Sequence, residues 1–453
     1  MKSKITFLLS LTKSKHVLSL TSNGINAVIG VVTLSILFRH LTRQDMGNWG
    51  FFLTILLLVD TFRSGFLSTA FVKFYAGSTE ERKREIIGST WFIAIMITLI
   101  FVILNIPGYF VSGYISDPSF KLFLQFFSIN YVLSLPFFVS NCILQGKQRY
   151  DSLLFLNFAN QGCFLLLIIL NLKEINIHTV LYCYLAANFV SSSIAIFFKW
   201  TDISMLKFKS KAAMLEIYNF GKYSVGTNLS ANLLGSIDSF IIKLFLGPSV
   251  LAVYNAGTKL VQIIEIPLRS FVYTAMPTLS SFFNSNEKEK VISVMKKYVG
   301  MITIALISVS LLVIVFADLA ILIFSGPKYV ATEAPNILRI FMIIAFLYPA
   351  ERFFAVTLDV IHMPKVNLLK IILMVFVTVL TDWLAIVITG NVYVVAAASV
   401  FSTLTGLIVG YFAINHYYQK FTFFDMFISG YKEIILLLKR YYYRFFGKNY
   451  QIK

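Results

Sequence analysis

The sequence predicts an all-α integral membrane protein of about twelve transmembrane helices in two six-helix, pseudo-symmetric bundles. Of its 453 residues, 58% are hydrophobic and only 13% are charged, a composition too apolar for a soluble domain to cover with polar surface. The apolar residues gather in runs of about 20, the length that an α-helix needs to cross roughly 30 Å of hydrocarbon. A transmembrane β-barrel would instead alternate over segments of about 10 residues. A weak internal repeat completes the argument for two bundles.

The apolar runs place the expected helices in order along the chain. Those of the first half cover residues 17–38, 49–72, 87–110, 122–143, 152–172 and 178–198. Those of the second half cover residues 220–245, 251–275, 298–324, 335–361, 367–389 and 391–415. The short connections leave no room for a soluble catalytic domain of about 50 residues or more, and the sequence has no Gly-rich phosphate-binding loop. We therefore expect neither an enzyme nor a bound cofactor.

The internal repeat has an offset of about 205 residues. Its clearest match pairs Phe62-Arg63-Ser64 and Thr69-Ala70 with Leu268-Arg269-Ser270 and Thr274-Ala275. Each Arg follows an acid, Asp60 or Glu265, at a spacing that shares a helix face. Six helices per half give a parallel repeat whose halves can rock about a central site, which favours alternating access over a static pore. The expected bundles are residues 1–205 and 206–418.

The two ends of the chain are basic. Met1–Lys15 has too short an apolar run for a signal peptide and carries Lys where a cleavage site should be, so we interpret it as an uncleaved cytoplasmic leader. Residues 419–453 mix aromatic and charged side chains, which predicts a basic, aromatic interfacial tail rather than a thirteenth crossing.

The chain has a net charge of +18, and the positive-inside rule predicts on which side of the membrane its Lys and Arg residues lie. With the amino terminus inside, the large majority of Lys and Arg residues fall in cytoplasmic segments, such as the run Arg82-Lys83-Arg84. The charge then faces anionic headgroups of the inner leaflet, so no nucleic-acid partner is expected. We predict a multi-pass plasma-membrane protein with both termini in the cytoplasm.

Ionisable residues inside the expected helices are the candidate site residues, because an unpaired charge in mid-bilayer is costly and marks a pathway. The cationic candidates for substrate binding are Arg63, Lys259, Arg269, Arg339 and Arg352. The acidic candidates for ion coupling are Asp60, Asp238, Glu265 and Asp359, and Glu351 and Asp382 also fall inside helices. An excess of cations suits a phosphate-bearing anion. The alternative is that acid and base pairs only lock helices together.

Neither catalytic nor metal-binding residues are expected. The five histidines lie at helix ends without ligand spacing, and Cys142, Cys163 and Cys183 form no CxxC motif. Pro267 and Pro349 lie close to Arg269 and Arg352, where a missing backbone donor permits a kink and so mobility near these cations.

Several motifs, taken in order, resemble bacterial polysaccharide flippases of the multidrug/oligosaccharidyl-lipid/polysaccharide superfamily. The segments that carry the resemblance are Arg39 to Gly50, Gln145-Gly146-Lys147, Gly235 to Ile242 with Leu246-Gly247 and Tyr254-Asn255-Ala256, and Phe324 to Tyr329 with Ala334 to Ile340. The resemblance extends to about residue 415, and the tail is too charged to supply the two further helices of the related lipid II flippases.

The resemblance implies two six-helix bundles in a V, as in multidrug exporters of the same superfamily. It also implies that the substrate is an undecaprenyl-diphosphate-linked oligosaccharide, moved from the inner to the outer leaflet of the bacterial plasma membrane. Membrane lipids, and a polymerase and glycosyltransferases of the same pathway, are the implied partners. The product would be a surface polymer such as O antigen, capsule or exopolysaccharide.

Three alternatives remain open. A cation-coupled multidrug extruder shares the twelve-helix repeat, but unpartnered Arg and Lys in its membrane region argue against cationic cargo. A membrane polymerase or ligase would be expected to carry a large external loop, which the short connections do not provide. A scaffold without transport would leave the intramembrane charges unexplained.

Overall fold

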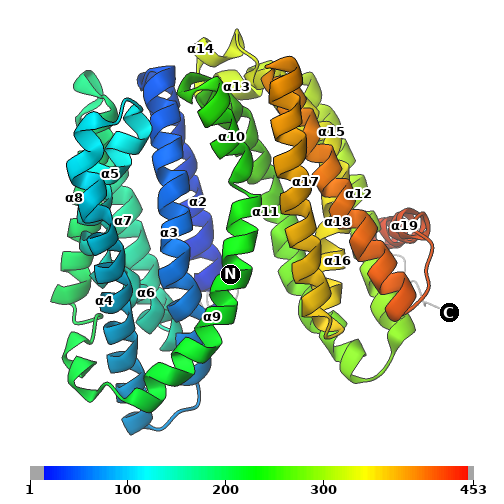
Figure 1. Cartoon of the computed structure of the whole chain (residues 1–453). Coiled ribbons are helices and arrows are strands. Elements are labelled where there is room, and N and C mark those ends of the chain that lie inside the picture. The colour runs from blue at the N-terminus through cyan, green and yellow to red at the C-terminus, as the bar shows by residue number, and fades with distance from the viewer. Residues whose placement is uncertain (1–14, 447–453) are drawn as a thin grey trace. The chain divides into compact units, whose positions relative to one another are not determined.

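The computed structural model describes the backbone of residues 15–446 and the side chains of residues 24–439. The predicted leader, except for its last residue, and the last residues of the predicted tail lie outside this part of the chain. The regular structure of the described residues is helical throughout. The chain divides into two compact units, Met1–Leu233 (unit 1) and Leu234–Lys453 (unit 2), which are coloured from blue to green and from green to red in Figure 1.

Unit 1 contains eight of the α-helices. They are α2 (Lys15–His40), α3 (Arg43–Tyr75), α4 (Glu80–Val111), α5 (Pro118–Leu133), α6 (Leu135–Gly146), α7 (Tyr150–Leu170), α8 (Ile177–Phe197) and α9 (Lys211–Leu234), with short 3-10 turns η1 (Ser112–Tyr114), η2 (Leu172–Glu174) and η3 (Ile203–Phe208). Side-chain caps set several of their starts: Thr42 accepts a hydrogen bond from the backbone of Asp45 at the start of α3, and Asp117 caps α5 just before Pro118.

Helix α9 packs on α3 at positions without side chains. A Cβ on Gly65 would overlap the backbone of Val225, and a Cβ on Gly221 would overlap Phe66. Ile217 of α9 also belongs to the hydrophobic core of unit 1. These contacts place α9 in unit 1, which ends at Leu233. The division into two six-helix bundles at residues 205 and 206 stays a prediction.

Unit 2 contains the remaining α-helices. They are α10 (Ile237–Leu246), α11 (Pro248–Asn284), α12 (Lys288–Val315), α13 (Ala317–Ser325), α14 (Pro327–Val330), α15 (Ala334–Ile344), α16 (Tyr348–Val360), α17 (Pro364–Thr389), α18 (Val392–Tyr417) and α19 (Asp425–Phe446), with η4 (Ala345–Leu347) between α15 and α16. Its core joins Phe353 and Phe354 of α16 to Met295 of α12 and Ile414 of α18. Met426 at the start of α19 belongs to the same core.

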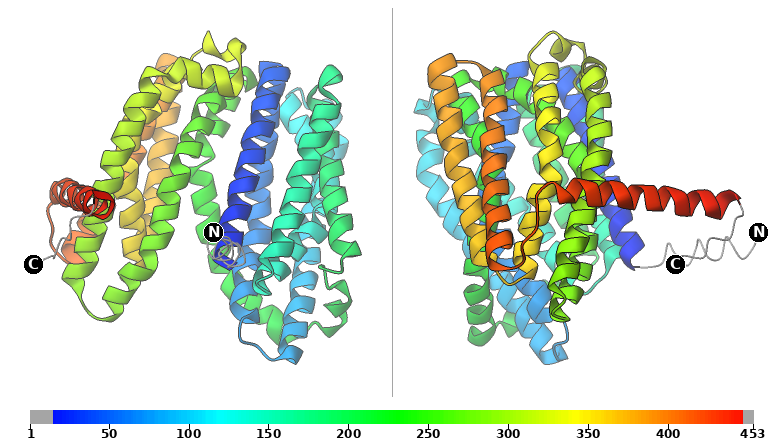
Figure 2. Two further views of the ribbon diagram at one scale, coloured as in Figure 1. Left: turned by 180° about the vertical axis from the view of Figure 1, so that it is seen from behind. Right: turned by 90° about the vertical axis from the view of Figure 1, so that its right-hand side faces the viewer.

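Helix α19 crosses α12 instead of running beside it. The right-hand view of Figure 2 shows α19 perpendicular to the long helices of unit 2, with its far half extending beyond them. The crossing point is Gly300 against Gly430, where a Cβ on either residue would overlap backbone atoms of the other helix. The ion pair between Lys297 and Glu433, at 3.1 Å, lies next to it. The predicted tail is therefore a docked helix, although its insertion at the membrane surface stays a prediction.

The expected transmembrane segments all correspond to helices. Eight helices are long and apolar enough to cross a membrane, and the bent pairs α5–α6 and α9–α10 raise the number to ten among the described residues. The other two expected spans correspond to α2, whose part Gly24–His40 is a shorter apolar helix, and to the long helix α11. The break between α5 and α6, with a bend of 46°, falls at Ser134, two residues before Pro136.

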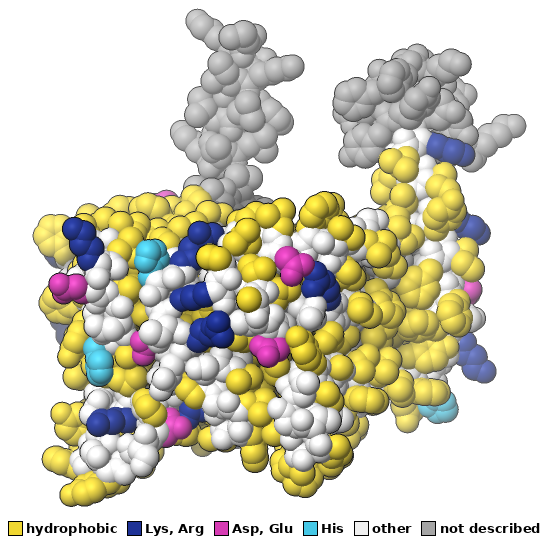
Figure 3. Space-filling view, turned by 90° about the horizontal axis from the view of Figure 1, so that it is seen from above, with side chains coloured by type: hydrophobic (Ala, Val, Ile, Leu, Met, Phe, Trp, Pro, Cys, Tyr) yellow, Lys and Arg dark blue, Asp and Glu magenta, His cyan; other side chains and the backbone are white. Residues whose placement is uncertain are grey.

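Hydrophobic side chains cover the flanks of the molecule. Leu104, Phe110, Phe197, Val315 and Ile388 are each more than half exposed, and in the end-on view of Figure 3 charged side chains lie on the end face while hydrophobic ones prevail along the sides. Such a surface is stable in hydrocarbon and not in water. The all-helical membrane fold predicted from the sequence is confirmed.

Candidate functional site

In unit 1, Arg63 is held by the interior of the bundle. Its Nη2 lies 2.6 Å from Oδ1 of Asp60, Nη1 donates to the carbonyl of Tyr131 at 3.0 Å, and Nη2 also donates to Ser134 Oγ at 3.1 Å. The guanidinium stacks on the Tyr131 ring, 3.8 Å from its centroid, and only 3% of the residue is exposed. Because Tyr131 and Ser134 lie where α5 gives way to α6, Arg63 ties α3 to this break.

In unit 2, five charged side chains form a continuous chain across three helices. Glu265 Oε2 lies 3.2 Å from Arg269 on α11 and 3.8 Å from Arg352 on α16. Arg352 lies 3.6 Å from Glu351, and Glu351 accepts a hydrogen bond of 2.6 Å from Lys370 on α17. Three cations and two acids leave one net positive charge. We call these five residues the charged chain.

Burial changes along the charged chain. The Lys370 and Glu351 side chains are 1% and 9% exposed, whereas Arg269 and Arg352 are 56% and 46% exposed. Neutral pairing is essential at the buried end, because an isolated charge in an apolar interior is very unfavourable. Both guanidinium groups at the exposed end contact Glu265, and Arg352 also contacts Glu351. Because each Arg has five N–H donors, these contacts leave donors available to a ligand. An anion with several oxygens is the ligand that suits them.

The two repeat-related arginines therefore have different surroundings. Arg63 has its donors directed to Asp60, Tyr131 and Ser134 inside the bundle, while Arg269 pairs with Glu265 and is mostly exposed. From the sequence alone the two arginines look equivalent, because each lies one helical turn after an acidic residue. The difference arises from α5 and α6, whose break brings a carbonyl and a hydroxyl to Arg63.

A second polar cluster in unit 2 joins α10, α11 and α17. The Tyr254 hydroxyl donates to Asp238 Oδ2, and the Asp382 carboxyl lies near that of Asp238. Asp382 is completely buried, and no donor in the described part of the chain reaches either of its oxygens. Two adjacent carboxylates in apolar surroundings can both stay charged only if a cation lies between them. Without a cation, they share a proton, which neutralises one of them.

The other predicted residues lie elsewhere. Lys259 on α11 is half-buried and contacts Gln262 at 3.1 Å. Arg339 on α15 pairs with Asp318 at the start of α13 and donates to Asn336 Oδ1 at 2.6 Å. Asp359 lies at the last turn of α16, where it accepts a hydrogen bond from Asn367 at 3.0 Å. Within the described residues, none of these three forms an ion pair or a hydrogen bond with the charged chain.

Sequence reasoning missed the roles of Lys370 and Tyr254. Lys370 lies near the start of the expected helix 367–389, a position where a cation is ordinary. Only its contact with Glu351 shows that it is buried and paired. Tyr254 was noticed only as part of a motif. The available signal was the number of acids inside the second half, each of which needs a partner in hydrocarbon.

Within the residues that the structure describes, no group of three or more His, Cys, Asp and Glu residues could hold a metal ion. The charged chain and the paired acids suit two kinds of chemistry: binding of an anion by exposed guanidinium groups, and exchange of a proton or a monovalent cation at Asp238 and Asp382.

Comparison with protein families agrees with the resemblance in the motifs. A family model described as "Polysaccharide biosynthesis protein" matches residues 13–283, and the MatE family model matches residues 224–368. Among curated proteins, none is similar enough in sequence to match this chain.

Solved structures of two kinds share the fold. An inward-facing multidrug resistance MATE family transporter of the MOP superfamily has a TM-score of 0.73 at 14% identity, with 94% of this chain and 99% of that chain covered. The lipid II flippase MurJ in an inward closed conformation also gives 0.73 at 14% identity, with 96% and 94% covered. A MOP superfamily transporter from Pyrococcus furiosus gives 0.61 at 13% identity, with 93% and 94% covered.

These three solved structures with this fold are of two transporters and a flippase. The match to the first family model covers more than half of the chain, and the fold extends over nearly all of it. The chain therefore belongs to the polysaccharide biosynthesis protein family, and it has the multi-pass membrane fold of the MATE transporter and the lipid II flippase.

Proposed function

We propose that this protein flips an undecaprenyl-diphosphate-linked oligosaccharide from the inner to the outer leaflet of the bacterial plasma membrane, for the synthesis of a surface polysaccharide. The observation that carries the proposal is the exposed pair Arg269 and Arg352, which share Glu265 and leave guanidinium donors free. A diphosphate offers several oxygens and two or more negative charges, which suits two neighbouring forks. The match to a polysaccharide biosynthesis family supports the same class of cargo.

The geometry suggests how binding and release are balanced. Glu265 contacts both guanidinium groups, so it competes with the diphosphate for the same donors. A diphosphate with its higher charge displaces this contact, and the return of Glu265 favours release. Arg63 we now assign to the positioning of α3 against the α5–α6 break, because its donors are already used within unit 1.

We also propose that Asp238 and Asp382 couple transport to an ion gradient. A proton or Na⁺ at this pair would neutralise buried charge, and its loss would favour a different packing of α10 against α17. In proteoliposomes, Asp238→Asn and Asp382→Asn should abolish acceleration by a proton or Na⁺ gradient but keep the rate without a gradient. Asp359→Asn is the matched control, since Asp359 lies at the end of α16. Equal acceleration in all three variants would contradict the assignment.

A cation-coupled multidrug extruder is the second candidate, because the MatE family model matches residues 224–368. That function needs an acidic binding surface for cationic drugs, whereas the exposed end of the charged chain is basic. Drug susceptibility of a deletion strain separates the two functions. An increase in susceptibility to cationic drugs with normal surface polymer would favour extrusion.

Complementation in cells tests the cargo proposal. In a deletion strain, Arg269→Gln and Arg352→Gln should each lower surface polysaccharide by about tenfold, the effect of losing one charge-assisted contact of roughly 1.5 kcal/mol. Arg149→Gln is the control, because Arg149 lies in an exposed loop beside Asp151. Membrane levels of all variants are measured by immunoblotting. Normal polymer in both test variants at normal protein levels would overturn the proposal.

Orientation and partners complete the proposal. Both termini are cytoplasmic by the distribution of Lys and Arg, which places the α3–α4 connection and the start of α12 on the cytoplasmic side. Glycosyltransferases that build the cargo would then act on this side, and a polymerase would consume it outside. O antigen, capsule and exopolysaccharide are the polymers that this order of steps can serve.

A further inference from the structure

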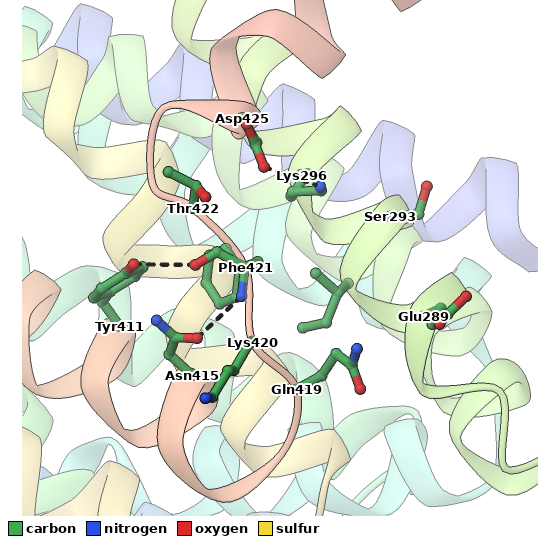
Figure 4. Close-up of a pocket in the computed structure, with 11 residues that line it drawn as sticks. Glu289, Ser293, Lys296, Tyr411, Asn415, Gln419, Lys420, Phe421, Thr422 and Asp425 are labelled. Atoms are coloured by element: carbon green, nitrogen blue, oxygen red, sulfur yellow. Dashed lines mark hydrogen bonds and ion pairs between the residues drawn. The ribbon is translucent and has the colours of Figure 1, made fainter.

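A polar groove lies on unit 2 where α12, the end of α18 and the segment leading into α19 meet. Its volume is about 590 Å³, and its lining includes Glu289, Ser293 and Lys296 of α12. Figure 4 shows Asp425 beside Lys296, with Thr422 and Phe421 on the segment that closes one side. The distance from Lys296 Nζ to Asp425 Oδ2 is 3.8 Å, so the ion pair is loose and leaves ammonium donors free.

Two hydrogen bonds fix the shape of the groove. Asn415 accepts a hydrogen bond from the backbone of Phe421, and the Tyr411 hydroxyl donates to the carbonyl of the same residue, both at 3.0 Å. Phe421 is buried in the core of unit 2. The closing segment is therefore held by both its backbone and its side chain, and the groove is preformed.

The groove lies at the level where unit 2 passes from charged to apolar residues. The first ten residues of α12 include Lys288, Lys296 and Lys297, while the helix after Tyr298 is almost wholly apolar. Helix α19 crosses α12 at Gly300, just past this transition. We expect a helix that runs across the spans at such a level to lie in the membrane interface, with the groove open to lipid headgroups.

The face that α19 presents to its surroundings agrees with this level. Ile428, Tyr431 and Leu438 fall within about 80° of one another on a helical wheel of 100° per residue, and each is more than half exposed. Lys432 and Lys439 follow on the neighbouring side of the helix and are exposed. The apolar stripe is suited to the acyl boundary and the Lys residues to the phosphate layer.

The charges in the groove are balanced. Lys296 and Lys420 line it together with Glu289 and Asp425, so the sum is zero. Glu289 and Lys296 are seven residues apart on α12 and share a face, about 10 Å apart along the axis. A ligand with one negative and one positive group, separated by a few ångströms, can meet both ends through side chains of this length.

We propose that this groove binds the headgroup of a zwitterionic inner-leaflet phospholipid with a primary ammonium group. Its phosphate contacts Lys296 and Lys420, with hydroxyl donors from Ser293 and Thr422, and its ammonium donates to Glu289 and Asp425. An anionic headgroup without an amine would leave both carboxylates facing added negative charge. A neutral sugar carries no charged group to pair with the two Lys and two acidic side chains of the groove.

A bound lipid of this kind would hold α19 against α12 from the membrane side. Asp425, the first residue of α19, would contact the lipid ammonium as well as Lys296, and the acyl chains would stay in the bilayer beside the apolar stripe. The site is independent of the cargo proposed above, because it involves neither the charged chain nor the paired acids.

Native mass spectrometry of the purified full-length protein tests the proposal, with phosphatidylethanolamine, phosphatidylcholine and phosphatidylglycerol offered at equal concentration. We expect phosphatidylethanolamine to bind about tenfold more tightly than the other two, because only its ammonium has N–H donors for both acids. Free phosphoethanolamine is a fourth arm and should bind far more weakly, because it lacks the acyl chains. Equal binding of the three lipids by the native protein would overturn the proposal.

Variants assign the two ends of the headgroup. Lys296→Gln should weaken phosphatidylethanolamine binding about tenfold, and Glu289→Gln should weaken it while strengthening phosphatidylglycerol. The matched controls are Lys290→Gln and Glu287→Gln, because Lys290 on α12 and Glu287 just before it form a neighbouring ion pair. Each control removes one charge of that pair and should leave the lipid preference unchanged. If Lys296→Gln fails to fold, the variant at the exposed residue Glu289 serves as the test. An unchanged preference of Glu289→Gln for phosphatidylethanolamine over phosphatidylglycerol would contradict the proposal. Equal effects of test and control variants would also contradict it.

Discussion

The ammonium group of Lys370 lies 2.6 Å from the carboxylate of Glu351, with both side chains buried between α16 and α17. This contact neutralises the inner end of the charged chain. The negative charge of Glu351 is therefore already balanced, and Arg352, which lies 3.6 Å away, remains half exposed. The buried ion pair thus keeps a guanidinium available at the surface of unit 2.

Removing one member of this pair should be strongly destabilising. Lys370→Met leaves Glu351 without its closest cation, a loss of order 3–5 kcal/mol for a broken buried pair. We expect a clearly lower thermal midpoint in detergent and a lower folded yield. The double variant Lys370→Met with Glu351→Met should recover most of the stability, because two apolar side chains replace the pair. A single variant as stable as the native protein would contradict this reading of the contact.

Arg63 and Arg269 should respond differently to the same change. Arg63→Lys loses the geometry that reaches Asp60, Tyr131 and Ser134 together, so folded yield should fall, since each hydrogen bond to a charged group contributes about 1.5–3 kcal/mol. Arg269→Lys should keep the yield and lower transport, because it has a single ion pair in unit 2. Fluorescence-detected size-exclusion measures the yield, and surface polymer measures transport. The reverse pattern would reassign Arg63 to cargo binding.

The crossing of α12 and α19 should tolerate no side chain. Gly300→Val or Gly430→Val would force backbone atoms apart, with an overpacking cost of about 1–3 kcal/mol. Helix α19 should then become accessible to protease while the rest of unit 2 stays folded. Gly226→Ala in α9 is the control, since no atom lies within 4 Å of the added Cβ. Protection of α19 equal to that in the control would show that the crossing is not needed for docking.

Topology is tested by reporter insertion. Alkaline phosphatase should be inactive when fused after Lys453 and active when inserted at the η2 turn, Leu172–Glu174, because the Lys and Arg distribution places these on opposite sides of the membrane. A cytoplasmic reporter such as a fluorescent protein should give the inverse pattern. Active alkaline phosphatase at Lys453 would contradict an even number of crossings with a cytoplasmic amino terminus.

The positions of the helices were predictable, because the run length of apolar residues follows from bilayer thickness. The break near Pro136 also had a local cause, since proline lacks a backbone donor. The pairing of charges was not predictable. Glu351 and Lys370 are 19 residues apart and lie on different helices, so only tertiary packing brings them together.

The repeat was informative about architecture and misleading about chemistry. It relates Arg63 to Arg269, and both indeed pair with the acid one turn earlier. Their remaining contacts depend on neighbouring helices, which the local sequence pattern does not encode. The contact of Asp238 with Tyr254 and Asp382 is a similar case, since three helices contribute one side chain each.

Flipping by the purified protein tests the central claim most directly. The protein is reconstituted in proteoliposomes with a fluorescent undecaprenyl-diphosphate-linked oligosaccharide, and access of the label to an external quencher is followed in time. We expect rapid loss of the protected fraction with the native protein and a rate at least tenfold lower with the double variant Arg269→Gln and Arg352→Gln, at equal reconstitution. Native and double-variant proteins that flip the lipid at the same rate as empty liposomes, or at the same rate as each other, would contradict the account.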